Sequence, residues 1–282
     1  IWSGVWIGLS LIFGAGLWVW QGQEAATQYL LGYLLEKSLS VDNIFVILMI
    51  FSYFAVPPQY QHKILFWGIL GALVMRASLI FLGVALIHRF HAIIYFFGAL
   101  LLWAAWRMGR HQEAEIDPDR NPVVRLFRQL MPITTEPAGG KFFVREHGKL
   151  AATPLFLCLL TIETADLAFA VDSIPAIFGV TEDPFIIYTS NIFAILGLRS
   201  LYFALAGVIH RFHYFRYGLA AVLAFVGVKM LISEFYKFPA WAALAVVVGC
   251  IGVAVAASLW FPPRTAIVDG VAVSKPEDQP RD

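Results

Sequence analysis

Charged side chains are scarce in this sequence. They make up 14% of its 282 residues, while 60% of the residues are hydrophobic and the mean hydropathy is +0.74. Soluble domains carry roughly 25% charged residues because their surface faces water. The deficit indicates that most of the surface faces lipid, so the lipid bilayer is the first expected partner. The 20 Lys and Arg residues only balance the 19 Asp and Glu residues, which gives no support for a nucleic-acid partner.

Cysteine and the common catalytic motifs are also lacking. The two cysteines, Cys158 and Cys250, both lie inside apolar runs and are expected to be small core residues rather than a disulfide. No GxxxxGK[ST] loop, HExxH motif or Ser-His-Asp arrangement is evident. We therefore expect no enzyme, no prosthetic cofactor, and no transport powered by the protein's own ATP hydrolysis.

Long apolar runs are what the sequence has in abundance. A helix needs about 17–25 apolar residues to cross the hydrocarbon core, and about eight segments meet this length. They lie near 2–20, 28–54, 62–87, 92–108, 153–178, 184–208, 214–235 and 239–260. The expected fold is an all-α transmembrane domain over residues 1–262, followed by a disordered tail over 263–282.

The basic residues between these spans fall mainly on one side. With eight crossings, 14 Lys and Arg residues lie on the side of the 109–152 loop and the C-terminal tail, against two on the other side. The positive-inside rule places that loop and the tail in the cytoplasm. Within the loop, KFFVREHGKLAAT alternates apolar and polar residues, which predicts a short hairpin.

The chain matches itself in three places, always in the same order. HRFH at 88–91 recurs at 210–213, an offset of 122; the stretch around Arg76 matches that around Arg199, an offset of 123; and Glu36 matches Asp166 at an offset of 130. The matches define a first repeat at about 28–108 and a second at about 153–235, with 239–260 as a closing helix. Three spans per repeat give an inverted repeat, an arrangement of many transporters with a midplane substrate site.

Several carboxylates interrupt the apolar spans. Each charge at a helix centre costs roughly 2.5–3.5 kcal/mol unless it has a partner. One interpretation is purely structural pairing with Arg76 and Arg199; the other is that the acids pair with these arginines and also bind a cation. The five acids are Glu36, Asp42, Glu163, Asp166 and Asp172.

Oxygen-bearing neighbours, among them Asn43 and Asn191, favour a hard cation such as Mg²⁺, Ca²⁺ or Mn²⁺. Glu163 and Asp166 share a helix face because they are three residues apart. Asp166 and Asp172 are six apart and point about 120° from one another on a regular helix. Either the helix unwinds there, for which Pro175 gives a physical cause, or the two acids face different neighbours.

These stretches resemble the TerC family of integral membrane proteins. The similar segments include GYLLEKSLSVDNIFVI, KFFVREHGKLAATPLF, ETADLAFAVDSIPAIFGVT and DPFIIYTSNIFAILGLRSLYF. The resemblance implies a link to LysE-type exporters, manganese efflux and tellurium resistance, and it implies a further acidic helix before Ile1. Carried over residue by residue, the motif acids are Glu36, Asp42, Glu163, Asp166 and Asp172, with Asn43 and Asn191 as polar companions.

The resulting hypothesis is a divalent cation exporter of the bacterial inner membrane, with Mn²⁺ as the expected substrate and with Arg76 and Arg199 neutralising the empty site. The alternative is a non-transport scaffold protein that supports tellurite resistance or membrane-protein assembly, in which the ion pairs are structural. The oligomeric state, the driving ion and the direction of transport stay open.

Overall fold

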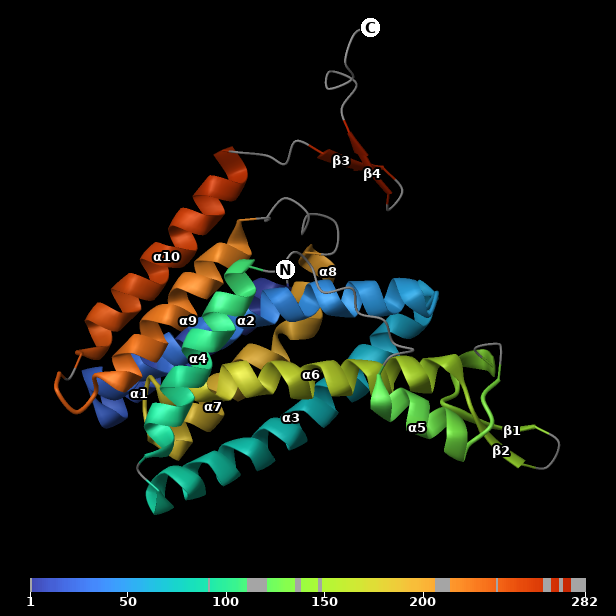
Figure 1. The fold of residues 1–282 in the computed structure, drawn as a ribbon, viewed down its shortest axis with the longest axis horizontal. Coiled ribbons are helices and arrows are strands. Elements are labelled where there is room, and N and C mark those ends of the chain that lie inside the picture. The colour runs from blue at the N-terminus through green and yellow to red at the C-terminus, as the bar shows by residue number, and fades with distance from the viewer. Residues whose placement is uncertain are drawn as a thin grey trace, which may run out of the picture.

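The computed structural model shows a bundle of long helices (Figure 1). It describes residues 2–90, 92–110, 121–134, 138–146, 149–205, 214–236, 238–260, 265–268 and 271–274. The helices of the bundle are α1 (Trp2–Gln21), α2 (Gln23–Tyr53), α3 (Pro58–Arg89), α4 (Ile93–Arg110), α6 (Pro154–Phe178), α7 (Pro184–Leu196), α8 (Leu198–Leu205), α9 (Phe215–Leu231) and α10 (Ala240–Trp260).

Each of the eight expected spans is found as helix, and one of them is broken. The segment expected at 184–208 divides into α7 and α8, which meet at Gly197 with a bend of 40°. By length and hydropathy, α1, α3, α6 and α10 can cross a membrane, and the bent pair makes a fifth candidate among the described residues. The longest acid-bearing helix, α2, carries Glu24, Glu36, Lys37 and Asp42, which lowers its hydropathy. The fold is that of an all-α, multi-pass membrane protein.

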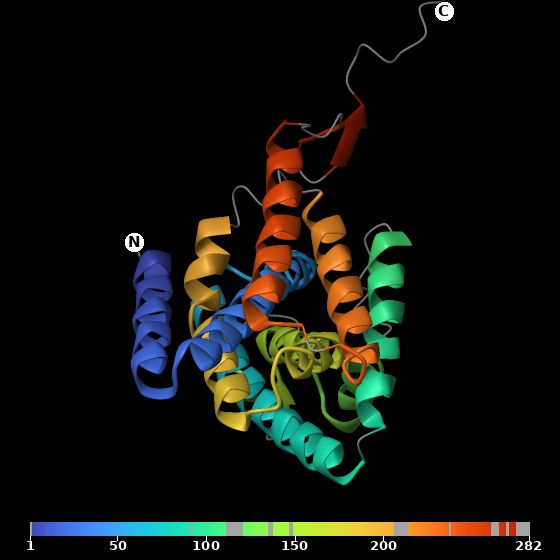
Figure 2. The same ribbon diagram turned by 90° about the vertical axis from the view of Figure 1, so that its left-hand side faces the viewer.

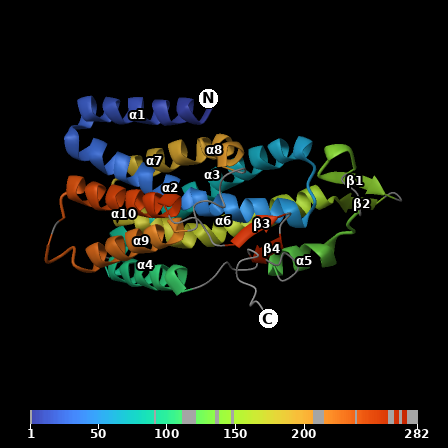
Figure 3. The ribbon, with the colours of Figure 1, turned by 90° about the horizontal axis from the view of Figure 1, so that it is seen from above.

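Seen from above, α1 lies at one edge of the bundle and α4 at the other (Figure 3), while α4, α9 and α10 are steeply inclined to α6 (Figure 1). Among the described elements, α2 packs against α7, α6 packs against α3, and α4 packs against α9. Figure 2 shows α9 and α4 side by side, on the opposite side of α10 from α1. A two-fold relation between the repeats would pair the helices in this way; the inverted repeat itself stays a prediction.

Prolines begin the helices of the second half instead of breaking them. Pro154 and Pro184 stand in the first turns of α6 and α7, where the missing amide hydrogen leaves no bond unmade. Of the two alternatives for Asp166 and Asp172, the break near Pro175 is not found, because α6 continues through Pro175 to Phe178. Pro175 lies in the last turn of α6, so only one helical hydrogen bond is lost before the helix ends.

The polar loop between the repeats forms a small structure at one end of the bundle (Figure 1). It contains α5 (Pro122–Leu130), a 3-10 turn at Ala138–Gly140, and the strands β1 (Phe143–Glu146) and β2 (Lys149–Ala152). The strands pair antiparallel, Phe143 opposite Ala152, so the predicted hairpin is confirmed. Lys63 of α3 fixes this structure to the bundle by donating to the carbonyl oxygen of Gly140 at 2.8 Å.

The tail needs a correction. Within 263–282, expected to be disordered, β3 (Thr265–Val268) and β4 (Val271–Ser274) pair antiparallel. Both strands are rich in β-branched residues, and the sequence between them is Asp-Gly, the dipeptide that favours two-residue hairpin turns. The other residues of the tail lie outside those described.

Candidate cation site

A buried arginine on α3 stands at the centre of the candidate site. Arg76 is only 2% exposed. Its Nη2 donates to Oδ1 of Asp166 at 3.0 Å and its Nε donates to Oδ2 at 3.3 Å, which is a bidentate ion pair. Its Nη1 donates to Oε1 of Glu36, a carboxylate with 2% exposure. One guanidinium therefore joins α2, α3 and α6 inside the bundle.

The two acids on Arg76 are the two that the repeat matches. Glu36 comes from α2 and Asp166 from α6, and each occupies the same place in its repeat, at the offset of 130. Burying an unpaired charge is costly. Because Arg76 pairs with both acids, it holds α2 and α6 against α3. The predicted countercharge role of Arg76 agrees with this geometry.

Two polar side chains complete the surroundings of the guanidinium. Nη1 of Arg76 also donates to Oγ of Ser173 and to Oδ1 of Asn191, each at 3.3 Å. Asn191 is 2% exposed, and its Nδ2 has no hydrogen-bond partner within the described part of the chain. A buried amide donor left unpaired costs free energy, so this nitrogen marks a position where a further oxygen acceptor would be favourable.

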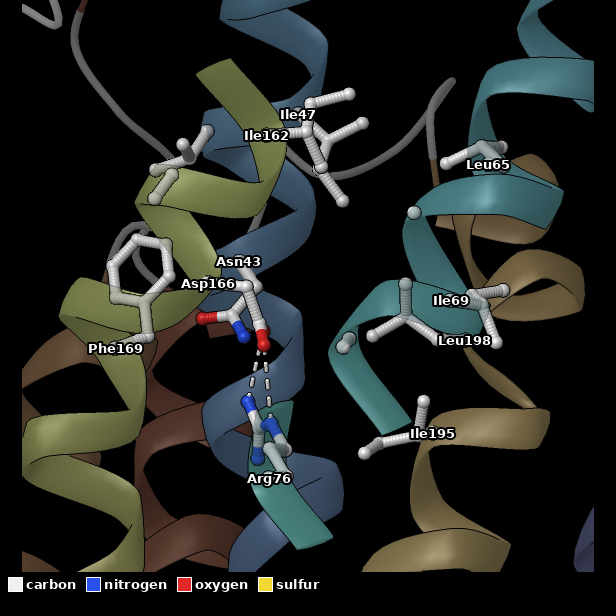
Figure 4. A pocket seen from close by; sticks show the side chains of 14 residues that line it. Asn43, Ile47, Leu65, Ile69, Arg76, Ile162, Asp166, Phe169, Ile195 and Leu198 are labelled. Carbon is white, nitrogen blue, oxygen red and sulfur yellow. Dashed lines mark hydrogen bonds and ion pairs between the residues drawn. The ribbon is translucent and has the colours of Figure 1, made fainter. Parts of the chain in front are cut away.

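A small cavity adjoins the ion pair (Figure 4). Arg76, Asp166 and Asn43 form its polar end, while apolar side chains make up most of its wall. Its volume is about 40 Å³, and one water molecule needs at least roughly 10–15 Å³. The cavity therefore has room for a cation that keeps part of its water shell. The apolar wall includes Ile47, Leu65, Ile69, Ile162, Phe169, Ile195 and Leu198.

Glu163 lies one turn before Asp166 and faces the same neighbouring helix. Its carboxylate occupies the space where Gly71 of α3 would carry a Cβ, and the residue is half-buried. The predicted shared face of Glu163 and Asp166 is thus present, directed at α3. Glu163 therefore lies next to the Arg76 group on α6, while the acids that pair with the guanidinium in the described part of the chain are Glu36 and Asp166.

One of the predicted acids, Asp172, lies away from this group. Asp172 pairs with Arg107 of α4, with 4.0 Å between Nη2 and Oδ2. Because α6 is uninterrupted, six residues of helix turn Asp172 away from Asp166, so the two acids face different neighbours. Asp42 is half-buried on α2, and it is not among the residues that line the cavity. The six-residue spacing already contained this signal, but a partner on α4 could not be deduced from it.

Arg199 requires a correction as well. The sequence comparison makes it the equal of Arg76, yet it is exposed on α8 and its Nη2 lies 3.1 Å from Nδ1 of His62. The reason is the bend at Gly197, two residues earlier, whereas α3 runs through Arg76 without interruption. Arg199 is therefore not a countercharge of this group.

Lys37, to which no sequence motif points, lies at that same bend. Its Nζ donates to the carbonyl oxygen of Ala194 at 3.2 Å and stands where Gly197 would carry a side chain. The end of α7 exposes carbonyl oxygens that lack helical partners, and a cation near them is favourable. The broken span is thereby held to α2 beside the acid Glu36.

The described residues do not hold three His, Cys, Asp or Glu side chains grouped as ligands of one metal ion. In this arrangement Arg76 occupies the space between Glu36 and Asp166. The same oxygen atoms can bind either the guanidinium or a hard cation. In this structure the guanidinium of Arg76 is the positive charge that the two acids bind.

The fold and this ion pair define a class: a multi-pass helical membrane protein with a buried ionic cluster beside a cavity. The sequence matches the family described as "Integral membrane protein TerC family" over residues 21–266. The chain belongs to this family.

Three relatives show how widely the likeness extends. The chain is 51% identical over 258 residues to "Uncharacterized membrane protein STKORF319" of Myxococcus xanthus, covering 92% of this chain and 81% of that one. It is 48% identical over 271 residues to "Putative membrane-bound redox modulator Alx" of Escherichia coli K12, covering 93% and 84%.

A plant protein is also similar. The chain is 44% identical over 229 residues to "Thylakoid membrane protein TERC, chloroplastic" of Arabidopsis thaliana, covering 81% of this chain and 60% of that one. No solved structure matches the chain.

Proposed function

We propose that this protein exports a divalent metal cation, Mn²⁺ in particular, across the bacterial inner membrane. The observation that carries the proposal is the meeting of two repeat-matched carboxylates, Glu36 and Asp166, on one buried arginine beside a cavity. Intramembrane carboxylates are costly, and they mark ion pathways more often than lipid-facing structure. Membership of the TerC family supports a membrane role of this kind.

The ligands that we assign to the cation are hard oxygen atoms. Glu36, Asp166 and Glu163 supply carboxylates, and Asn191 and Asn43 supply amide oxygens near the guanidinium and the cavity. Such a set suits Mn²⁺, Mg²⁺ or Ca²⁺ and is poorly suited to Cu⁺. Asp172 belongs outside this inner set, since its partner is Arg107 of α4.

Arg76 gives the site a means to exist without the cation. In its absence, the guanidinium neutralises Glu36 and Asp166, so the carboxylates are never left buried and unpaired. When a divalent cation binds these oxygens, it replaces the positive charge that Arg76 otherwise supplies to them. The cation is therefore exchanged against an internal positive charge, which keeps the cost of entering the membrane interior low.

The orientation belongs to the same proposal. The 109–152 loop and the C-terminal tail lie in the cytoplasm, as the distribution of basic residues predicts. A transport role, rather than an enzymatic one, fits a site made of ion-pairing groups and lined by apolar side chains.

A scaffold role is the second candidate, and one observation favours it. Both repeat-matched acids already have a partner in Arg76, and the described residues show no group of three metal-binding acids, histidines or cysteines. In that case the ion pair would only fix α2, α3 and α6 relative to one another.

The test is binding by the purified protein in detergent. We expect Mn²⁺ to raise the melting temperature, and Mg²⁺, Ca²⁺ and Zn²⁺ to compete with different strengths, because a ligand that binds only the folded state stabilises it. Glu36→Gln should abolish this rise and, in cells, should abolish the lowering of Mn²⁺ content that the wild-type protein produces. An unchanged melting temperature with every metal would favour the scaffold.

A further inference from the structure

Most of the residues that line the cavity lie on one side of the Arg76 ion pair, although Phe169 of α6 follows Asp166. Along α2, the lining residues Asn43 and Ile47 come after Glu36, and along α6 the lining residue Ile162 comes before Asp166. Both directions lead to the end of the bundle where β1 and β2 lie beside the start of α6 (Figure 1). The cavity therefore approaches the ion pair from the side of the 109–152 loop.

On the other side of the ion pair the helices close against each other. Gly32, one turn before Glu36, packs against Ile177 of α6 and Ser190 of α7: an added Cβ there would lie 3.0 Å from Oγ and 3.3 Å from Cβ of Ser190. Ile177 is 1% exposed and Ser190 is fully buried. Glycine permits this close approach, and a side chain here would push against the side chains of Ile177 and Ser190.

The repeat relates this closed contact to the cavity wall. The offset of 130 takes Gly32 to Ile162 and Ile47 to Ile177, and the offset of 123 that applies around Arg76 takes Gly68 to Asn191, the neighbour of Ser190. Ile162, Ile47 and Gly68 all line the cavity. Matching positions are thus closed in one half of the molecule and border a cavity in the other.

The two contacts also differ in tightness. A Cβ added at Gly68 would meet Cγ2 of Ile162 at 3.6 Å and Cδ1 of Leu159 at 3.8 Å, which are ordinary van der Waals distances. At Gly32 the neighbours would have to move. The contacts around Gly68, on the cavity side, are therefore looser than the matching contacts around Gly32.

We propose that Gly32, Ile177 and Ser190 form the outer seal of the cation path, and that Ile162, Ile47 and Gly68 form the matching inner seal. The inference rests on the proposed transport function. The structure is then the state that is open toward the 109–152 loop, with the outer seal closed. Transport requires the inner contacts to tighten while the outer ones part, which exposes Glu36 and Asp166 to the opposite side.

A disulfide across the outer seal tests this proposal. Gly32→Cys with Ser190→Cys, in a Cys158→Ala/Cys250→Ala background, places two Cβ atoms about 3.3 Å apart, near the range of about 3.5–4.5 Å that disulfides adopt. Oxidation should stop Mn²⁺ efflux from proteoliposomes, and reduction should restore it. The oxidised protein should still show the rise in melting temperature with Mn²⁺, because the cavity side stays open.

The controls separate this proposal from the proposed function. Each single cysteine variant should transport in oxidising conditions as in reducing ones. Undiminished efflux through the cross-linked protein, or failure of the disulfide to form in folded protein, would overturn the seal. If the cysteine-free background moves no Mn²⁺, the proposed function fails instead.

Cysteine labelling tests the outer seal even if the cysteine-free background moves no Mn²⁺ or the double variant does not fold. A membrane-impermeant maleimide should modify Ile47→Cys from the side of the 109–152 loop only. Ser190→Cys should stay unmodified from both sides in the absence of metal. Ready modification of Ser190→Cys in the absence of metal would show that the outer contact is open and the proposal wrong.

Discussion

Arg76 in the first half of the chain and Arg199 in the second occupy matching sequence positions, yet their surroundings are opposite. Arg76 is buried between two carboxylates, while Arg199 is exposed beside His62. The motifs are alike, but α3 is continuous and its counterpart bends at Gly197. A repeat therefore preserves residues more faithfully than it preserves their contacts, and Arg76 alone pairs with one acid from each repeat.

The comparison predicts its largest effect at the arginines themselves. Arg76→Ala strands Glu36 and Asp166 inside the bundle, and breaking a buried pair costs about 3–5 kcal/mol. Arg199→Ala removes an exposed group and should change the free energy of unfolding by no more than about 0.5 kcal/mol. Thermal unfolding in detergent measures both. Saturating Mn²⁺ should recover part of the loss in Arg76→Ala, because the cation replaces the missing positive charge.

Equal loss of stability in the two variants would show that the repeats are more symmetric than the structure has them. A loss in Arg76→Ala that Mn²⁺ leaves untouched would make the arginine a structural anchor unrelated to any cation.

The second prediction concerns Mn²⁺ efflux and distinguishes Asp166 from Asp172, two acids of α6. Asp166→Asn removes a charge from the Arg76 group and should abolish Mn²⁺ efflux, whereas Asp172→Asn should retain most of it. Arg107 is 54% exposed and 4.0 Å from Asp172, so losing that pair should cost no more than about 1 kcal/mol. Cellular Mn²⁺ content and expression level are measured for each variant. Lost efflux in a well-folded Asp172→Asn protein would place this acid on the path.

The smallest effect concerns a glycine that only one repeat has. Gly71 faces the Glu163 carboxylate, while the matching position in the second repeat is Ala194. Gly71→Ala must displace Glu163 or α3, and such overpacking costs about 1–3 kcal/mol. Gly249→Ala is the control because an added Cβ meets nothing within 4 Å, and a helical Gly→Ala change of that kind stabilises by about 0.4–1 kcal/mol. Equal denaturation profiles would mean that Glu163 moves freely and does not depend on Gly71.

The sequence was sufficient for the helices because the signal is local. About eight apolar runs appear as helices, and alternation in 143–152 appears as a hairpin. The sequence was insufficient to locate the position where a helix bends or continues. Pro175 is the residue expected to interrupt a helix and does not do so, while Gly197, beside which the span bends, gives a weaker signal because glycine also serves close packing.

The candidate site divides in the same way. Burial cost identified the five acids and Arg76 without any structure, since an intramembrane charge needs a reason. The pairing of Asp172 with Arg107, and the contact of Lys37 with the end of α7, depend on which helices become neighbours. Spacing along one helix gives the direction in which a side chain points, but not what it meets there.

The sequence by itself determined that this is a helical membrane protein of the TerC family with matched acids inside its spans, because hydropathy and motif are properties of short segments. Only the tertiary structure decided that Glu36 and Asp166 share Arg76, that Arg199 lies apart, and that a cavity opens on one side of the pair. Those facts follow from the packing of α2, α3, α6 and α7, where a single bend at Gly197 moves a side chain from a buried cluster to the surface.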